Sequence, residues 1–275
     1  MNENVKWIAC AVGVVGLSIG AVVYRDKWWR DRPPTAAKPP AAAPAEPVKP
    51  LVPEEPAIKH PLPPAETQEP LPPLESSDEP LQKTLAELMG AQNVERFVFS
   101  QDLVRHFVAT IDNLPEPKVA ARIRPLTPVP GKFAVDGSEE SPVLDASNYE
   151  RYKPVVQAMT SLDTQQLVTT YQRYYPLLQQ SYEGLGHPPQ YFNDRMIQVI
   201  DHLLETPEAR DPIRLTRPGL QYEFADPKLE SLSAGQKLLI RMGGENAAAV
   251  KAKLREIRGM LEAKADAPAE EKPAQ

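Results

Sequence analysis

Residues 192–206, Phe-Asn-Asp-Arg-Met-Ile-Gln-Val-Ile-Asp-His-Leu-Leu-Glu-Thr, carry a clear helical pattern. Their large apolar side chains recur at intervals of three and four residues, which places them on one face of an α-helix. These side chains are Phe192, Met196, Val199, Ile200, Leu203 and Leu204. The pattern predicts a helix that ends near Thr206 and is buried by one face.

Similar periods occur on both sides of this stretch, so residues 81–262 are predicted to form one mainly α-helical globular domain. Apolar residues at helical spacing predict helices over 81–89 and 103–111, and a last helix through 250–261. Other expected helix starts pair a short polar residue with Glu or Gln three residues later. These pairs are Ser147 with Glu150, Asp163 with Gln166, and Ser233 with Gln236.

Two regions of the domain are expected to be non-helical. Residues 114–146 contain six prolines and are predicted to be an irregular excursion over the surface. Residues 213–216 and 221–224 have the composition of short strands. They flank Arg-Pro-Gly-Leu at 217–220, in which Pro and Gly suit the central positions of a type II turn. One small β-hairpin is therefore expected.

An uncharged apolar run occupies residues 7–24 and is followed by a basic, aromatic stretch at 25–32. Eighteen helical residues span about 27 Å, close to the roughly 30 Å of a bilayer's hydrocarbon core. Trp7 and Tyr24 are residue types that settle at the headgroup level. The sequence thus predicts an N-terminal flank at 1–6, a single transmembrane helix at 7–24 in contact with the lipid bilayer, and a membrane flank at 25–32.

Alternatives remain open for whether this segment is cleaved as a signal peptide and for its orientation across the membrane. Ser-Ile-Gly at 18–20 imitates the cleavage site of a signal peptide, although the apolar run continues beyond it. One basic residue, Lys6, precedes the run and four follow it within residues 25–32, a distribution that favours a cytoplasmic carboxyl side. Long domains cross the membrane largely regardless of charge. The expected location is the bacterial inner membrane, single-pass, with a periplasmic C-terminal domain.

Residues 33–80 contain 16 prolines and no aromatic residue or glycine, so they cannot form a packed core. Proline favours extended backbone, and the segment is predicted to be a disordered, polyproline-rich linker of up to about 150 Å. Residues 263–275 are predicted to be a disordered tail. The domain at 81–262 holds 21 basic and 23 acidic side chains, and this balance argues against a nucleic-acid partner.

Four peptides occur in order within the domain: Tyr191–Arg195, Val199–Leu204, Tyr222–Pro227 and Ser233–Gly243. With them the chain resembles an uncharacterised family of membrane-anchored proteobacterial proteins, known only as a domain of unknown function. The resemblance covers about residues 80–262. It implies an envelope protein with a single span and one soluble domain, and it brings no catalytic residues.

Two groups of side chains are candidates for ligand binding. Tyr171, Tyr175 and Tyr182 share one helix face, and Tyr191 follows them; such rings line grooves for an extended peptide or a glycan chain, with core packing as the alternative. A second group would hold a carboxylate or phosphate if the hairpin packs against the helix after Ser233. Its members are Arg214, Arg217, Lys237 and Arg241. Pairing of these cations with nearby acidic residues is the alternative.

Acid–base or metal chemistry would have to use Asp194, Asp201 or His202, of which only the two carboxylates share a helix face. No catalytic residue, metal or cofactor is predicted. The function expected is that of a non-enzymatic envelope protein whose helical domain binds a protein or cell-wall component at a distance from the inner membrane. The alternative is a membrane-tethered hydrolase that uses Asp194, Asp201 or His202.

Overall fold

The computed structural model describes residues 57–63 and 70–265. In this part of the chain helices dominate, so the predicted mainly α-helical class is confirmed. In chain order the helical elements are the 3₁₀ turn η1 (Leu74–Ser76), α2 (Asp78–Met89), α3 (Ala91–Phe97), α4 (Leu103–Asn113), the 3₁₀ turn η2 (Ala121–Ile123), α5 (Ser147–Thr160), α6 (Thr164–Gly184), α7 (Phe192–Leu204), α8 (Pro227–Glu230), α9 (Ala234–Arg241) and α10 (Gly244–Ala265).

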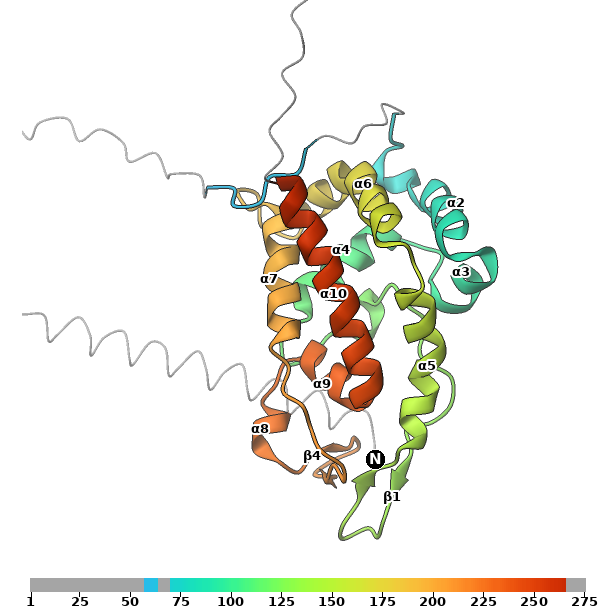
Figure 1. The fold of residues 1–275 in the computed structure, drawn as a ribbon, viewed down its shortest axis with the longest axis vertical. Helices are drawn as coiled ribbons and strands as arrows, with labels where there is room; N and C mark the ends of the chain where they lie inside the picture. The colour runs from blue at the N-terminus through green and yellow to red at the C-terminus, as the bar shows by residue number, and fades with distance from the viewer. Residues whose placement is uncertain (1–56, 64–69, 266–275) are drawn as a thin grey trace, which may run out of the picture. The chain divides into compact units, whose positions relative to one another are not determined.

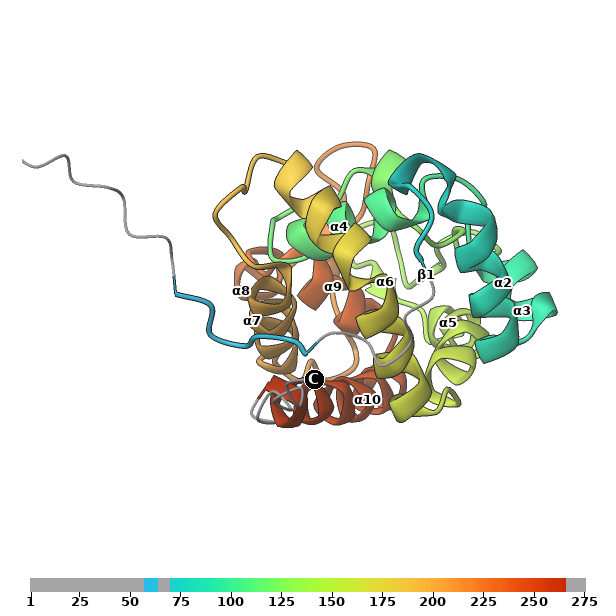
Figure 2. The same cartoon turned by 90° about the horizontal axis from the view of Figure 1, so that it is seen from above.

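The long C-terminal helix α10 organises the packing of the others. It contacts α5, α6, α7 and α9, and in Figure 1 it crosses the front of the domain between α7 and α5. Helix α6 lies behind it and contacts α4 on its other side, as the view from above in Figure 2 shows. Helices α2 and α3 pack against each other at the edge of the domain.

The main hydrophobic core lies between α4, α6, α7 and α10. Its most deeply buried side chains include Val108, Tyr182, Phe192 and Leu261, each at most 1% exposed. The helical period of residues 192–206 explains this burial, because Phe192, Met196 and Ile200 of α7 face the same cluster. The apolar face predicted from the sequence is thus the face that α7 buries.

Two of the three polar pairs predicted to start helices provide a side-chain cap. Asp163 accepts a hydrogen bond from the amide of Gln166 at 2.8 Å and caps α6. Ser233 and Gln236 form a complete capping box at the start of α9. The expected box at Ser147 and Glu150 does not form, because α5 begins after Ala146 and the carboxylate of Asp145 accepts the Ser147 amide instead.

Within residues 57–63 and 70–265 the strands form two antiparallel pairs. In the predicted hairpin, β3 (Leu215–Thr216) pairs with β4 (Glu223–Phe224), which confirms the hairpin with shorter strands. A second pair, β1 (Val135–Asp136) with β2 (Val143–Leu144), lies inside the region predicted to be irregular. Apolar side chains of β2, β3, β4 and α9 form one small cluster, so tertiary packing supports strands too short to carry a sequence period.

The helical region extends beyond both expected boundaries. Helix α2 begins at Asp78, before residue 81, and α10 continues to Ala265, beyond residue 262. The predicted span at residues 7–24 and its flanks lie outside the described residues. Among the helices at 70–265, none is long and apolar enough to cross a membrane.

The break between α9 and α10 provides a sharp test of the packing. Gly243 has φ +86°, and a Cβ there would lie 2.6 Å from the ring of Tyr149, whereas a Cβ at Gly244 meets nothing within 4 Å. Gly243→Ala should therefore lower the free energy of unfolding by about 2 kcal/mol through backbone strain, before any cost of moving the ring. Gly244→Ala is the matched control and should change it by less than about 0.5 kcal/mol. Denaturant unfolding of both variants measures the difference, and equal stabilities would contradict this packing.

Candidate binding site at the start of helix α7

A short irregular stretch from the predicted linker, Ala57–Pro63, bends at Lys59 and His60 against the start of α7 and is called the docked segment here. The amides of Lys59 and His60 donate to the two oxygens of the Asp194 carboxylate at 3.0 and 2.8 Å. The amide of Leu62 donates to the Tyr191 hydroxyl at 2.9 Å. Three backbone donors of the docked segment are therefore held by side chains of one helix start.

One backbone carbonyl of the docked segment is also hydrogen-bonded to the start of α7. His60 O accepts a hydrogen bond of 2.9 Å from the side-chain amide of Asn193, which is fully buried. The other end of that amide, Asn193 Oδ1, accepts from the Tyr171 hydroxyl at 3.1 Å. The name docking groove is used below for Tyr171, Tyr175, Tyr191, Asn193 and Asp194, of which Tyr191 and Asp194 line an open depression and Asn193 is buried.

The first amides of α7 explain why polar side chains gather at this point. The N-cap residue Tyr191 makes no side-chain capping bond to them. Helix α6 caps them instead, because Gln179 Oε1 accepts from the Phe192 amide at 2.8 Å and the Tyr175 hydroxyl accepts from the Asn193 amide at 3.2 Å. Neither Gln179 nor Asn193 was selected from the sequence, since cross-helix capping leaves no short-range pattern.

The four tyrosines predicted as a ligand surface do gather here. The rings of Tyr171 and Tyr175 are 5.7 Å apart at 63°, and those of Tyr175 and Tyr191 are 5.3 Å apart. Tyr182 lies behind them in the core, stacked on His187 at 4.7 Å. Tyr191 bonds the docked segment directly, whereas Tyr171 and Tyr175 bond Asn193. Tyr182 combines a core position with a hydroxyl bonded to Gln190.

Burial changes the acid–base behaviour of these phenols. It raises the pKa of Tyr171 well above its usual value, and the nearby Tyr191 phenol adds to the rise. Burial also raises the pKa of Tyr175, although its bond from the Asn193 amide acts in the opposite direction. The phenols of Tyr171 and Tyr175 therefore stay neutral at physiological pH and act as hydrogen-bonding groups.

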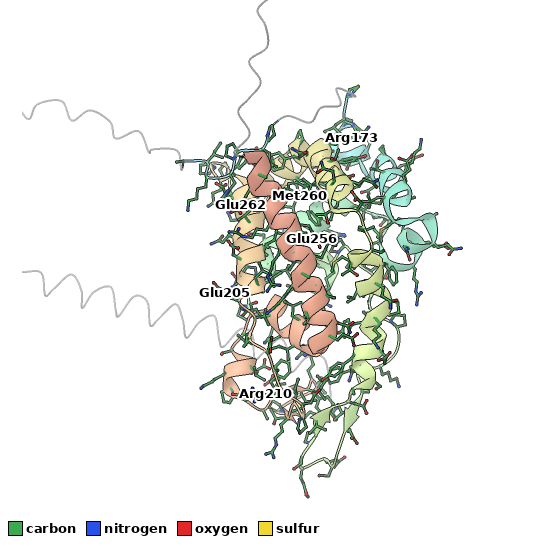
Figure 3. The ribbon with its side chains drawn as sticks, in the orientation of Figure 1. Arg173, Glu205, Arg210, Glu256, Met260 and Glu262 are labelled. Carbon is green, nitrogen blue, oxygen red and sulfur yellow. The ribbon has the colours of Figure 1, made fainter. Side chains whose placement is uncertain are left out.

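An open depression of about 880 Å³ continues from the docked segment along α7 to Glu205, which Figure 3 labels. Its polar wall includes Asp112 of α4, whose carboxylate accepts from Arg195 Nε at 2.8 Å. His187 Nε2 lies 3.4 Å from the same carboxylate. These contacts join α7 to α4 across the depression.

Asp194, Asp201 and His202 all border this depression, but each has a structural partner. Asp194 holds the docked segment, and Asp201 pairs with Arg258 of α10. His202 Nε2 lies 2.9 Å from Ser233 Oγ, the buried hydroxyl that caps α9. Within residues 57–63 and 70–265, no group of three or more His, Cys, Asp or Glu side chains is arranged to hold a metal ion.

The predicted basic cluster is distributed over the hairpin and α9. Lys237 is buried and bonded to Glu230 at 2.8 Å. Burial alone would raise the pKa of Glu230, but the bonds from Lys237 and from the Phe224 amide lower it. The guanidinium of Arg241 lies over the Phe224 ring, and that of Arg217 lies over the Tyr222 ring. Pairing and ring contacts therefore account for three of the four cations. The fourth, Arg214, directly precedes β3 and is exposed.

A buried lysine on α10 has an equally structural explanation. Lys253 Nζ donates to Leu162 O, Thr164 Oγ1 and Glu256 Oε2 at 3.0, 2.9 and 2.8 Å. Glu256, labelled on α10 in Figure 3, also accepts from Thr164 at 2.7 Å. This group ties α10 to the start of α6 and has its donors satisfied by the protein.

Fold and site together define a helical domain in which side chains at the start of α7 hold residues 57–63 of the same chain. A family model described as Protein of unknown function (DUF3014) matches residues 103–258, and because this is more than half of the chain, the protein belongs to that family. The predicted resemblance to an uncharacterised family is thereby confirmed. The match includes the docking groove and excludes the docked segment. No curated protein and no solved structure matches the chain.

The raised pKa values of Tyr171 and Tyr175 predict a loss of stability at alkaline pH. In the unfolded chain a phenol ionises near pH 10, whereas the buried phenols of Tyr171 and Tyr175 ionise at higher pH. Their contribution is complete below about pH 10 and is lost as pH rises towards the folded-state values. Denaturation midpoints should therefore fall between about pH 10 and 11.5, and less steeply in Tyr175→Phe. An identical slope in that variant would refute the assignment.

Proposed function

We propose that this chain is a membrane-anchored cell-envelope protein whose helical domain binds a protein or cell-wall component at a distance from the inner membrane. The order of its parts supports this proposal: an apolar run at residues 7–24, a proline-rich stretch at 33–80 and a helical domain. The observation that carries it is the docking groove, in which four hydrogen bonds hold the main chain of the docked segment.

The chemistry of the groove favours a protein over a glycan as the ligand. Asp194 and Tyr191 accept hydrogen bonds from backbone amides, while Asn193 donates to a backbone carbonyl. This combination of acceptors and a donor matches the main chain of a polypeptide, which carries both amide donors and carbonyl acceptors. A glycan offers hydroxyls and would lack the successive amides that the Asp194 carboxylate receives.

The tethered hydrolase using Asp194, Asp201 or His202 is the weaker alternative. A general acid or base needs a side chain free to reach the reacting atom. The Asp194 carboxylate already accepts two amides, Asp201 is paired with Arg258, and His202 contacts a buried capping hydroxyl. These three side chains border one depression, yet their partners account for their positions without a substrate.

Location in the bacterial inner membrane, with the helical domain in the periplasm, belongs to the same proposal. The basic residues after the apolar run oppose this direction, so topology needs its own test. A reporter enzyme that is active only outside the cytoplasm, fused after residue 265, should be active. Activity restricted to a cytoplasmic reporter at the same position would place the domain on the opposite side.

The linker is the feature that separates a binding role from catalysis. Deletion of residues 33–56 removes about 75 Å of reach at polyproline spacing and leaves the docked segment in place. In a strain that shows a phenotype on loss of the gene, this deletion should impair function, because the domain no longer reaches its partner. Replacement of residues 33–56 by a Gly/Ser sequence of equal length is the control and should retain function.

The matched catalytic variants are Asp201→Asn and His202→Gln, at equal protein levels. Both should retain function wherever the domain folds, because neither side chain is assigned to chemistry. A folded variant of either kind that loses function, together with a functional deletion protein, would replace the binding proposal with the hydrolase.

A further inference from the structure

Residues 70–102, called the arm below, are held to the rest of the domain by few buried side chains. Helix α2 buries none of its residues, and α3 buries only Phe97. The two helices pack chiefly against each other at the edge of the domain, as Figure 2 shows. The family match begins at Leu103, directly after the arm. A segment with so little buried apolar surface opens at a lower free energy than the helices of a core.

Hydrogen bonds hold the arm to the helical domain near its C-terminal end. The carboxylate of Asp78, at the start of α2, accepts from the amides of Asp102 and Leu103 at 2.7 and 2.9 Å. Asp102 has φ +51°, a left-handed conformation that strains a residue other than glycine. A further bond of 2.9 Å joins the Phe99 amide to the carbonyl of Pro125. Asp78 therefore fixes the strained junction at which the arm meets α4.

The docked segment fixes the chain on the other side of the arm. Its amides are bonded to Asp194 and Tyr191 at the start of α7. One leucine of the docked segment and three of the arm are partly buried against the main core cluster: Leu62, Leu71, Leu74 and Leu81. The chain from the docked segment to α4 is therefore a loop of about 40 residues whose two ends are both attached to the helical domain.

This closed loop couples the docked segment to the arm. Closing a flexible loop costs entropy, and for about 40 residues the length-dependent part of the cost corresponds to a factor of about 250 in an equilibrium constant. An open arm bears this cost while the docked segment stays bound, and is relieved of it when the segment is released. The bound segment thus disfavours opening of the arm. By thermodynamic linkage, an open arm weakens binding of the segment by the same factor.

We propose that the docked segment keeps the arm closed, so that release of residues 57–63 from α7 promotes opening of residues 70–102, and opening of the arm promotes release. When both are free, residues 57–102 add at most about 160 Å of extended chain ahead of α4. This added reach rests on the proposed function, because it matters to a domain tethered to a membrane. The coupling itself is a property of the fold and needs neither membrane nor partner.

Amide hydrogen exchange of the purified full-length protein tests the coupling from the side of the docked segment. Asp194→Ala removes the acceptor of two of its amides. Exchange throughout α2 and α3 should become at least fivefold faster, while α4, α6 and α10 keep their wild-type rates. Asp201→Asn is the matched control, because Asp201 lies on the same helix and pairs with Arg258. It should leave the exchange of α2 and α3 unchanged.

The reciprocal experiment begins at the arm. Asp78→Ala should speed exchange in α2 and α3 and also make the amides of Lys59 and His60 exchange at least threefold faster, although Asp78 bonds the start of α4. Glu79→Ala is the matched control, because Glu79 is an exposed acidic residue in the same first turn of α2. It should leave the rates at Lys59 and His60 at their wild-type values.

Unchanged exchange of α2 and α3 in either Asp194→Ala or Asp78→Ala would overturn the inference. An Asp78→Ala protein whose arm exchanges faster while Lys59 and His60 keep wild-type rates would overturn it as well. Asp194 lies in the first turn of α7. If Asp194→Ala disturbs that helix, replacement of residues 57–63 by a Gly/Ser sequence of equal length decides by the same criteria. Failure of these measurements rejects the coupling and leaves the tethered binding role to the linker deletion.

Discussion

The side-chain amide of Asn193, buried at the start of α7, is the interaction on which the site depends. It accepts from Tyr171 of α6 and donates to the carbonyl of His60, so it joins a helix, a neighbouring helix and the docked segment. A buried amide without partners costs about 1–3 kcal/mol, which makes this arrangement specific. The hydrogen-bonding needs of one residue thus link all three elements.

Helix α7 can carry such a site because its neighbours hold it from several directions. Gln179 and Tyr175 of α6 cap its first amides. Arg195 ties it to Asp112 of α4, and Asp201 ties it to Arg258 of α10. These ion pairs are partly exposed and individually weak, so the buried apolar face of α7 provides most of the stability while the pairs fix its orientation.

Most of the fold was predictable because its signals are local. The apolar period of residues 192–204 and the capping pair Ser233 and Gln236 need only neighbouring residues, and both appear in the structure. The β1–β2 pair was missed because its two-residue strands depend on packing against β3, β4 and α9. At α5, Asp145 took the amide that a capping box at Ser147 would have used.

Some residues of the candidate site could be predicted from the sequence, but the hydrogen bonds that connect them could not. Spacing on α6 correctly grouped Tyr171 and Tyr175, but nothing local shows that Asp194 receives amides from residues more than 130 positions away. Proline content indicated extended backbone for residues 57–63 and could not reveal that α7 offers it partners. Long-range hydrogen bonds between a helix start and a short irregular segment leave no periodic signal in either sequence.

Amide hydrogen exchange of the docked segment in the full-length protein tests the central claim most directly. The account predicts slowed exchange at Lys59, His60 and Leu62, because each amide donates to a side chain of α7. Asp194→Ala should remove the protection at Lys59 and His60 while helices α6 and α7 keep theirs. Exchange of these amides in the wild type at the rate of an unstructured peptide would contradict the docked arrangement.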